Sequence, residues 1–223
     1  MDHWILTLVI FAPLLGVLAL GCVPRTGERH AHRVAFLSSL VTLGLTVIAV
    51  SRFHAVTATG ERGDATFVLL QDLPWLEYRT TADITYRVGV DGISIWLVAL
   101  TAFLMPLAIW SSSSSIRTRV REYYVLLLLL QVGLLGVFCA MDLLLFYVFF
   151  EFTLIPLFFL IGIWGGAERR RAAAKFFLYT LAGSVLTFAG IVYLAYYSYT
   201  TQGYITLNIE ELTQMGQDGF LPL

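Results

Sequence analysis

One acidic residue lies inside the apolar segment at residues 143–164. Glu151 follows Asp142 by nine residues, which is about 13 Å along a helix axis. A helix that crosses a hydrocarbon core of about 30 Å would therefore hold this carboxyl near the bilayer midplane. Carboxylates at that depth are costly and usually mark ion pathways. We therefore predict that Glu151 exchanges protons; the alternative is a protonated, hydrogen-bonded structural glutamate.

The proton affinity of a buried carboxyl depends on the charges near it. A cation that approaches favours the ionised form, and burial in an apolar environment favours the protonated form. Movement of a cation toward or away from Glu151 would therefore change its proton occupancy, which is the physical basis of a coupled proton relay.

Two residues of the same segment could support Glu151. Tyr147 precedes it by one helical turn on the same face, where it could donate a hydrogen bond or only pack. Pro156 lacks an amide hydrogen and cannot bond to the carbonyl of Phe152, so we expect a local break in the helix hydrogen bonds. Such a break would leave a backbone oxygen for water or a proton carrier, unless Pro156 is an ordinary membrane-helix proline.

Lys175 is the only lysine among fourteen basic residues. Lysine can lose its proton when it is desolvated, whereas arginine stays charged. We therefore predict a proton-entry or relay role for Lys175. The competing interpretation is an interfacial side chain that extends toward the headgroups.

The elements that would hold these residues are membrane-spanning helices. The chain has 223 residues, of which 58% are hydrophobic and 13% are charged, well below the charged fraction of about 25% in soluble domains. The apolar residues form spans of about 20, which is the length that a transmembrane helix needs. We expect an all-α, polytopic bundle in one membrane domain, with six spans: 4–23, 34–53, 89–110, 123–141, 143–164 and 172–199.

The connections between these spans predict the orientation. Ten of the fourteen basic residues fall in or beside the first, third and fifth connections, which the positive-inside rule places in the cytoplasm. The N-terminus then lies outside. Residues 54–88 become an outer loop, with a hairpin expected within 67–90 from its β-favouring residues, and residues 200–223 become an outer tail. Asp142 marks a tight turn between the fourth and fifth spans.

Composition also argues against several classes of function. The net charge of −1 provides no basic surface for nucleic acid. Cys22 and Cys139 lack metal or disulfide spacing, and no nucleotide-binding glycine motif is present. We therefore expect no redox centre and no cofactor bound by this chain.

Two stretches resemble a known family. They are YRVGVDGISIWLVALTAFLMP at residues 86–106, and FYVFFEFTLIPLFFLIGIWG at 146–165 followed by KFFLYT at 175–180. They are similar to the M subunit (mitochondrial subunit 4) of respiratory NADH:quinone oxidoreductase, an antiporter-like proton channel. The resemblance implies that Glu151 is the essential fifth-helix glutamate and that Lys175 matches a family lysine. It places NADH, flavin, iron–sulfur clusters and quinone in other subunits, and implies a multi-pass protein of the cytoplasmic (inner) membrane.

The family has about fourteen helices, so we expect an antiporter-like fold that stops before helix seven. Its partners would be lipid and the other membrane-arm subunits, with a second polypeptide supplying helix seven onward as one alternative. Two other functions stay open: a subunit of a cation/proton antiporter or membrane hydrogenase, and a truncated scaffold that conducts nothing.

Overall fold

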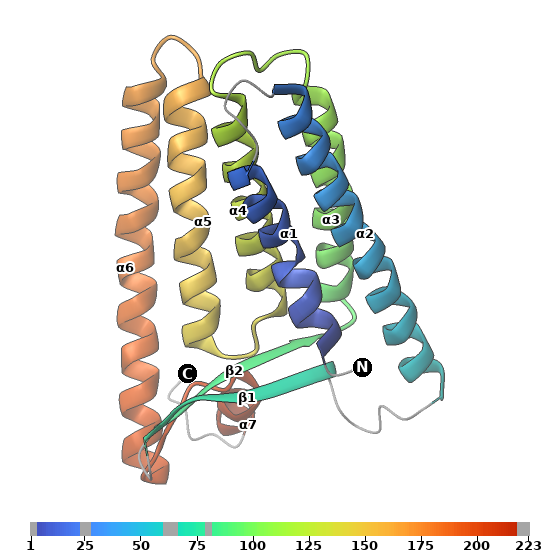
Figure 1. The fold of residues 1–223 in the computed structure, drawn as a ribbon. Coiled ribbons are helices and arrows are strands. Elements are labelled where there is room, and N and C mark those ends of the chain that lie inside the picture. Colours follow the sequence, from blue (N-terminus) through green and yellow to red (C-terminus); the bar gives the residue numbers. More distant parts are fainter. Residues whose placement is uncertain (1–3, 23–27, 60–66, 79–81, 218–223) are drawn as a thin grey trace.

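The structure is a computed structural model that describes residues 4–22, 28–59, 67–78 and 82–217. The chain has six long helices. They stand side by side, and strands cross one end of the bundle (Figure 1). The elements are α1 (Ile5–Cys22), α2 (Glu28–Thr59), β1 (Val68–Tyr78), β2 (Ala82–Val90), α3 (Ser94–Ser112), α4 (Val120–Cys139), α5 (Leu143–Trp164), α6 (Arg169–Gln202), β3 (Ile205–Thr206) and α7 (Ile209–Gln217). Within the described ranges, α1 to α6 are long and apolar enough to cross a membrane, which confirms the polytopic bundle.

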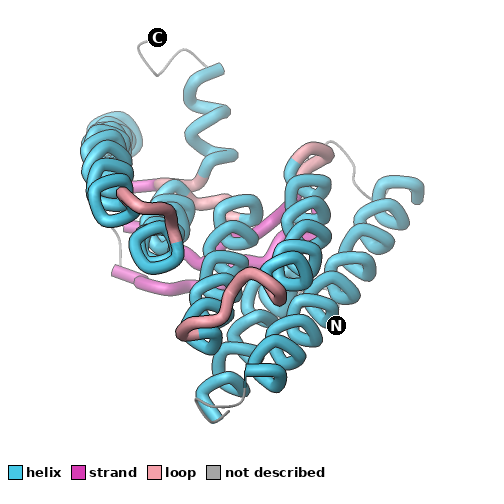
Figure 2. Tube along the Cα trace, turned by 90° about the horizontal axis from the view of Figure 1, so that it is seen from above, coloured by secondary structure: helices cyan, strands magenta, loops and turns pink. Residues whose placement is uncertain are grey.

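Helix α4 is the centre of the bundle and α6 is its edge. Helix α4 packs against α1, α2, α3 and α5, whereas α6 packs mainly on α5. The view from above shows the same arrangement, with α6 at one side of the molecule (Figure 2). The buried core therefore lies among α1 to α5, and α6 contributes little to it.

Two helices are longer than the sequence predicted. Helix α2 begins at Glu28 and ends at Thr59, beyond the predicted 34–53, so residues 54–59 are helical and not part of an outer loop. No proline or glycine interrupts these polar flanks, and the helix hydrogen bonds continue past the apolar residues. Helix α6 likewise continues to Gln202, where Gly203 ends it with a left-handed φ of 82°.

Helix α3 begins later than predicted, because residues 89–90 belong to β2. The carboxyl of Asp91 accepts hydrogen bonds from the backbone N–H groups of Ile93 (3.1 Å) and Ser94 (2.6 Å), and the Ser94 hydroxyl accepts one from the N–H of Asp91 (2.9 Å). This reciprocal capping starts the helix at Ser94. Although burial opposes it, the bonds from Ser94 and Ile93 hold the pKa of Asp91 below its usual value.

Strands β1 and β2 pair antiparallel in the segment where the sequence predicted a hairpin. An ion pair between Asp72 and Arg87 crosses them. The hairpin is also bonded to α1, since the Thr7 hydroxyl donates to Gln71 Oε1 (2.5 Å) and lies 3.1 Å from the hydroxyl of Tyr86. The hairpin therefore closes one end of the bundle instead of extending from it as a free loop.

The C-terminal segment, which we expected to be an outer tail, contains β3 and α7 and clamps the α4–α5 turn. The backbone N–H of Met141 donates to the carbonyl of Arg87 (2.9 Å), and the N–H of Leu143 donates to the carbonyl of Leu207 (2.9 Å). Asp142 is 1% exposed, and its carboxyl accepts from the N–H groups of Leu144 (2.9 Å) and Leu145 (3.1 Å). The turn is thus held between β2 and the C-terminal segment. These contacts join segments that are distant in the sequence, so the sequence pattern did not reveal them.

Helices α4 and α5 approach closely at two glycines. A Cβ added to Gly133 would lie 2.6 Å from Cγ2 of Thr153, and one added to Gly136 would overlap the ring of Phe149. The missing side chains let the two helices interlock, as small residues do in membrane bundles.

We predict that Gly136→Ala destabilises the protein by about 1–3 kcal/mol, because the new methyl group forces the Phe149 ring or the helix to move. Thermal unfolding in detergent measures the change. Gly190→Ala on α6 is the matched control, because a Cβ there meets nothing within 4 Å. Equal unfolding temperatures for the two variants would contradict the proposed close packing.

We also predict that Asp142→Ala lowers the unfolding free energy by about 1–2 kcal/mol, since it removes the acceptor for two N–H groups at the start of α5. Asp142→Asn retains a carbonyl oxygen at this position and should lose less. Denaturant titration in detergent provides the comparison, and an Ala variant as stable as the Asn variant would exclude a capping role.

Candidate functional site

Glu151 is the ninth of the 22 residues of α5. At 1.5 Å per residue it lies about 12 Å from Leu143 along the helix axis, near the middle of the span. The side chain is half-buried. Its Oε1 atom is buried without a hydrogen-bond partner. Glu151 therefore lies near the middle of α5 and is half-buried, and a carboxyl oxygen in such a position is costly when it is ionised.

The close contact with α4 determines which way Glu151 faces. Phe149 and Thr153 contact the α4 glycines. Glu151 is two residues from each, so it projects about 200° around the helix from both of them. Two residues on the same face of α5 as Glu151 contact α6. The ring centroid of Tyr147 is 5.1 Å from that of Phe188, and the ring centroid of Phe158 is 5.4 Å from that of Phe177. Glu151 therefore lies beside the α5–α6 contact, directed away from α4.

Tyr147 and Pro156 lie on α5 with Glu151 but do not bond to it. The Tyr147 ring packs on Phe188, and Oε1 of Glu151 has no partner. Pro156 is buried within a helix that continues from Leu143 to Trp164. The interruption is therefore confined to the amide hydrogen that Pro156 lacks, which leaves the carbonyl of Phe152 without that donor.

The structure does not bring Lys175 close to Glu151. Lys175 is exposed, and it is rotated about 200° around α6 from Ala173, a buried residue of the face toward α5. Because Phe177 is level with Phe158, Lys175 is also displaced from Glu151 by about 13 Å along the bundle. Lys175 is thus on the outer face of α6, and no relay between these two residues exists within the described part of the chain.

Sequence analysis missed Gln131. This α4 residue is completely buried, and both polar atoms of its amide lack a hydrogen-bond partner. Its signal was present, since it is the only amide in the apolar run 125–139. Gln131 lies about 160° around α4 from Gly133, so it faces away from α5. It is a second unpartnered polar group inside the bundle, separate from Glu151.

These groups can bind and release protons or water, and no other chemistry is evident from them. Among the residues that the structure describes, no group of three His, Cys, Asp or Glu side chains is placed to hold a metal ion. A carboxyl without a hydrogen-bond partner can accept a proton, and buried amide atoms commonly bind ordered water.

Comparison with known proteins matches two family models along the chain. Residues 34–137 match the model described as NADH-ubiquinone oxidoreductase chain 4, amino terminus. Residues 140–221, which include Glu151, match the model described as NADH:quinone oxidoreductase/Mrp antiporter, TM.

Individual relatives agree with these models. Subunit M of NADH-quinone oxidoreductase from Rhodobacter capsulatus is 41% identical over 84% of this chain and 35% of its own length. Chain 4 of the Arabidopsis thaliana NADH-ubiquinone oxidoreductase is 36% identical over 91% of this chain and 39% of its own. A chain of respiratory complex I from Thermus thermophilus with bound NADH superposes with a TM-score of 0.69 at 26% identity, covering 94% of this chain and 39% of that one.

The chain therefore spans 35% to 39% of the length of these relatives. It belongs to the family of the M subunit, or chain 4, of NADH:quinone oxidoreductase, and it resembles the amino-terminal part of that subunit.

Proposed function

We propose that this chain forms part of a proton-translocating subunit in the membrane arm of NADH:quinone oxidoreductase, with Glu151 as the residue that exchanges the proton. The observation that carries the proposal is the half-buried carboxyl in the middle of α5, whose Oε1 has no partner. Electron transfer belongs to other subunits, which hold the NADH, flavin, iron–sulfur and quinone sites. The chain couples to that chemistry through proton movement alone.

Proton release from Glu151 requires a cation that can approach it. Lys175 does not meet this requirement from its position on the outer face of α6. The cation must therefore come from a segment that packs beside α5 and α6 in the assembled complex. Its approach would favour the carboxylate and its withdrawal would favour the acid, which makes Glu151 responsive to movement in its neighbour.

The outer face of α6 is a separate surface, where a further polypeptide would pack. Its exposed side chains are large: Leu178 is 64% exposed, Tyr179 80% and Leu186 75%. We propose that another membrane-arm polypeptide, or one that supplies helix seven onward, covers this face together with Lys175. Lys175 would then lie in a protein interface, where its charge is sensitive to the partner.

We further propose a multi-pass location in the bacterial inner membrane, with the N-terminus outside. The described basic residues of the α3–α4 and α5–α6 connections lie at the end of the bundle opposite the hairpin (Figure 1). The positive-inside rule assigns that end to the cytoplasm. The hairpin and α7 then face the periplasm.

A cation/proton antiporter subunit is the second candidate, favoured by the description of the model that matches residues 140–221, which names the Mrp antiporter as well. Both machines use a buried titratable carboxyl, so Glu151 fits either. Dependence on NADH and quinone distinguishes the first from the second.

We predict that Glu151→Gln lowers proton translocation by the assembled enzyme by about tenfold or more, because an amide of nearly the same shape cannot exchange a proton. Inverted membrane vesicles energised with NADH allow dye quenching and NADH oxidation to be recorded together. Glu151→Asp retains the titrating group and should retain part of the activity.

The matched control is Glu168→Gln, the same chemical change at an exposed residue immediately before α6. It should leave translocation within about twofold of the unmodified enzyme. If Glu151→Gln translocates protons as well as the control does, the proton-transfer role is wrong and a non-conducting scaffold becomes the better description.

We also predict that a photo-crosslinking amino acid at Tyr179 forms adducts with protein in the assembled complex, because this 80%-exposed position lies on the outer face of α6. Irradiated membranes are resolved by gel electrophoresis and mass spectrometry. Adducts with lipid alone would place α6 against the bilayer and contradict the proposed partner.

A further inference from the structure

A small cavity of about 240 Å³ lies at the basic end of the bundle, away from Glu151. Three of its lining residues, Arg29, His32 and Arg33, come from the first turns of α2. Ser113 lies just after the end of α3, and Tyr124 lies on α4. Side chains from three separate parts of the chain therefore converge on one space.

The floor of this cavity is rigid and polar. The hydroxyl of Tyr124 is 3.1 Å from Nδ1 of His32, and Tyr124 is only 1% exposed. The His32 ring also stacks on Phe36, with centroids 6.2 Å apart. These contacts hold the imidazole in one orientation. When Nδ1 of His32 accepts a hydrogen bond from the Tyr124 hydroxyl, the Nε2–H group is free to donate to a ligand.

The walls carry positive charge without a compensating acid. Arg29 and Arg33 are four residues apart on α2, so their like charges lie on one face and repel. Among the residues that the structure describes, no carboxylate lines the cavity. Neither Arg29 nor Arg33 has an ion-pair partner among these residues. An anion in the cavity would relieve the repulsion and accept hydrogen bonds from the guanidinium groups, from the imidazole and from the Ser113 hydroxyl.

We propose that this cavity binds a single phosphate group. Guanidinium groups bind phosphate through paired N–H donors, and the imidazole of His32 and the hydroxyl of Ser113 add further donors from other directions. Both a lipid headgroup and free phosphate offer this chemistry. The bound anion would link α2 to the α3–α4 connection and to the first turns of α4. These elements also pack together there through a buried hydrophobic cluster that includes Ala31, Val120 and Tyr124.

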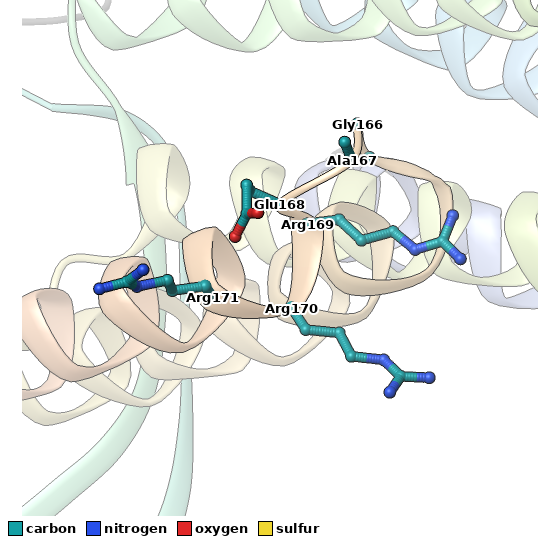
Figure 3. Close-up of a pocket in the computed structure, with 7 residues that line it drawn as sticks. Gly166, Ala167, Glu168, Arg169, Arg170 and Arg171 are labelled. Carbon is teal, nitrogen blue, oxygen red and sulfur yellow. The ribbon is translucent and has the colours of Figure 1, made fainter.

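A second basic cavity shows why side-chain convergence matters. The α5–α6 connection forms a larger pocket lined by residues 165–171, including Arg169, Arg170 and Arg171. Its arginines do not converge, since Arg171 extends in the opposite direction from Arg169 and Arg170 (Figure 3). All three are exposed, as are Arg29 and Arg33, so the two cavities differ in the direction of their arginines and not in exposure. This pocket lies at the same end of the protein and provides a control for simple charge attraction.

The test uses the full chain in nanodiscs of phosphatidylcholine with a small share of phosphatidylglycerol, analysed by native mass spectrometry for retained lipid. The double variant Arg29→Gln/Arg33→Gln is compared with Arg169→Gln/Arg170→Gln, which removes the same charge from the diverging cluster. A second arm titrates inorganic phosphate in lipid-free detergent and follows thermal unfolding.

We expect the unmodified protein to retain one phosphatidylglycerol. A fall in this retention by about tenfold or more in the Arg29/Arg33 variant, but not in the control, supports the site with a lipid as its occupant. Stabilisation by inorganic phosphate with the same dependence supports it with free phosphate as occupant.

Tyr124→Phe preserves the aromatic ring and both arginines, so a change in binding in this variant would not result from loss of the fold. It should weaken phosphate-group binding by about threefold or more, because the hydroxyl that orients the His32 imidazole is lost. The proposal is overturned if both double variants bind lipid and phosphate equally, or if Tyr124→Phe leaves binding unchanged.

Discussion

The antiparallel contact between α4 and α5 is the constraint on which the candidate site depends. Gly133 and Gly136 allow Phe149 and Thr153 to occupy space that side chains would otherwise fill. This contact fixes the rotation of α5 about its axis. Because Glu151 is two residues from each contact residue, the same rotation turns its carboxyl away from α4 and toward the side where α6 packs.

The turn that joins α4 and α5 fixes the position of Glu151 along the helix axis, whereas the glycine contact fixes the direction in which its side chain points. Asp142 caps α5 while the backbone on either side of it bonds to β2 and to the C-terminal segment. The first turn of α5 therefore cannot shift along its axis without breaking bonds in both neighbours. The strands and α7, which hold no titratable group of the candidate site, thus position the carboxyl from one end of the bundle.

The bundle is organised differently on its two sides. Among α1 to α5 the core is closed, and it contains the unpartnered amide of Gln131 and the unpartnered hydroxyl of Ser38. Buried polar atoms of this kind are commonly satisfied by ordered water. Around α6 the protein is open and apolar. Glu151 lies at the boundary between the two, where the proposed proton exchange would need both a path through the bundle and a charge on a neighbouring segment.

The sequence by itself determined the number of spans, the position of the α4–α5 turn, the segment that forms the hairpin and the position of Glu151 along its helix. These features depend on composition and on length along one helix, which are local properties. Tertiary structure decided that Lys175 faces outward, that Gln131 is buried, that Tyr147 packs on Phe188 and that the C-terminal segment clamps the turn. The direction of a side chain around a helix depends on which segments pack against it. In helices that are apolar on every side, no hydrophobic stripe in the sequence reveals that choice.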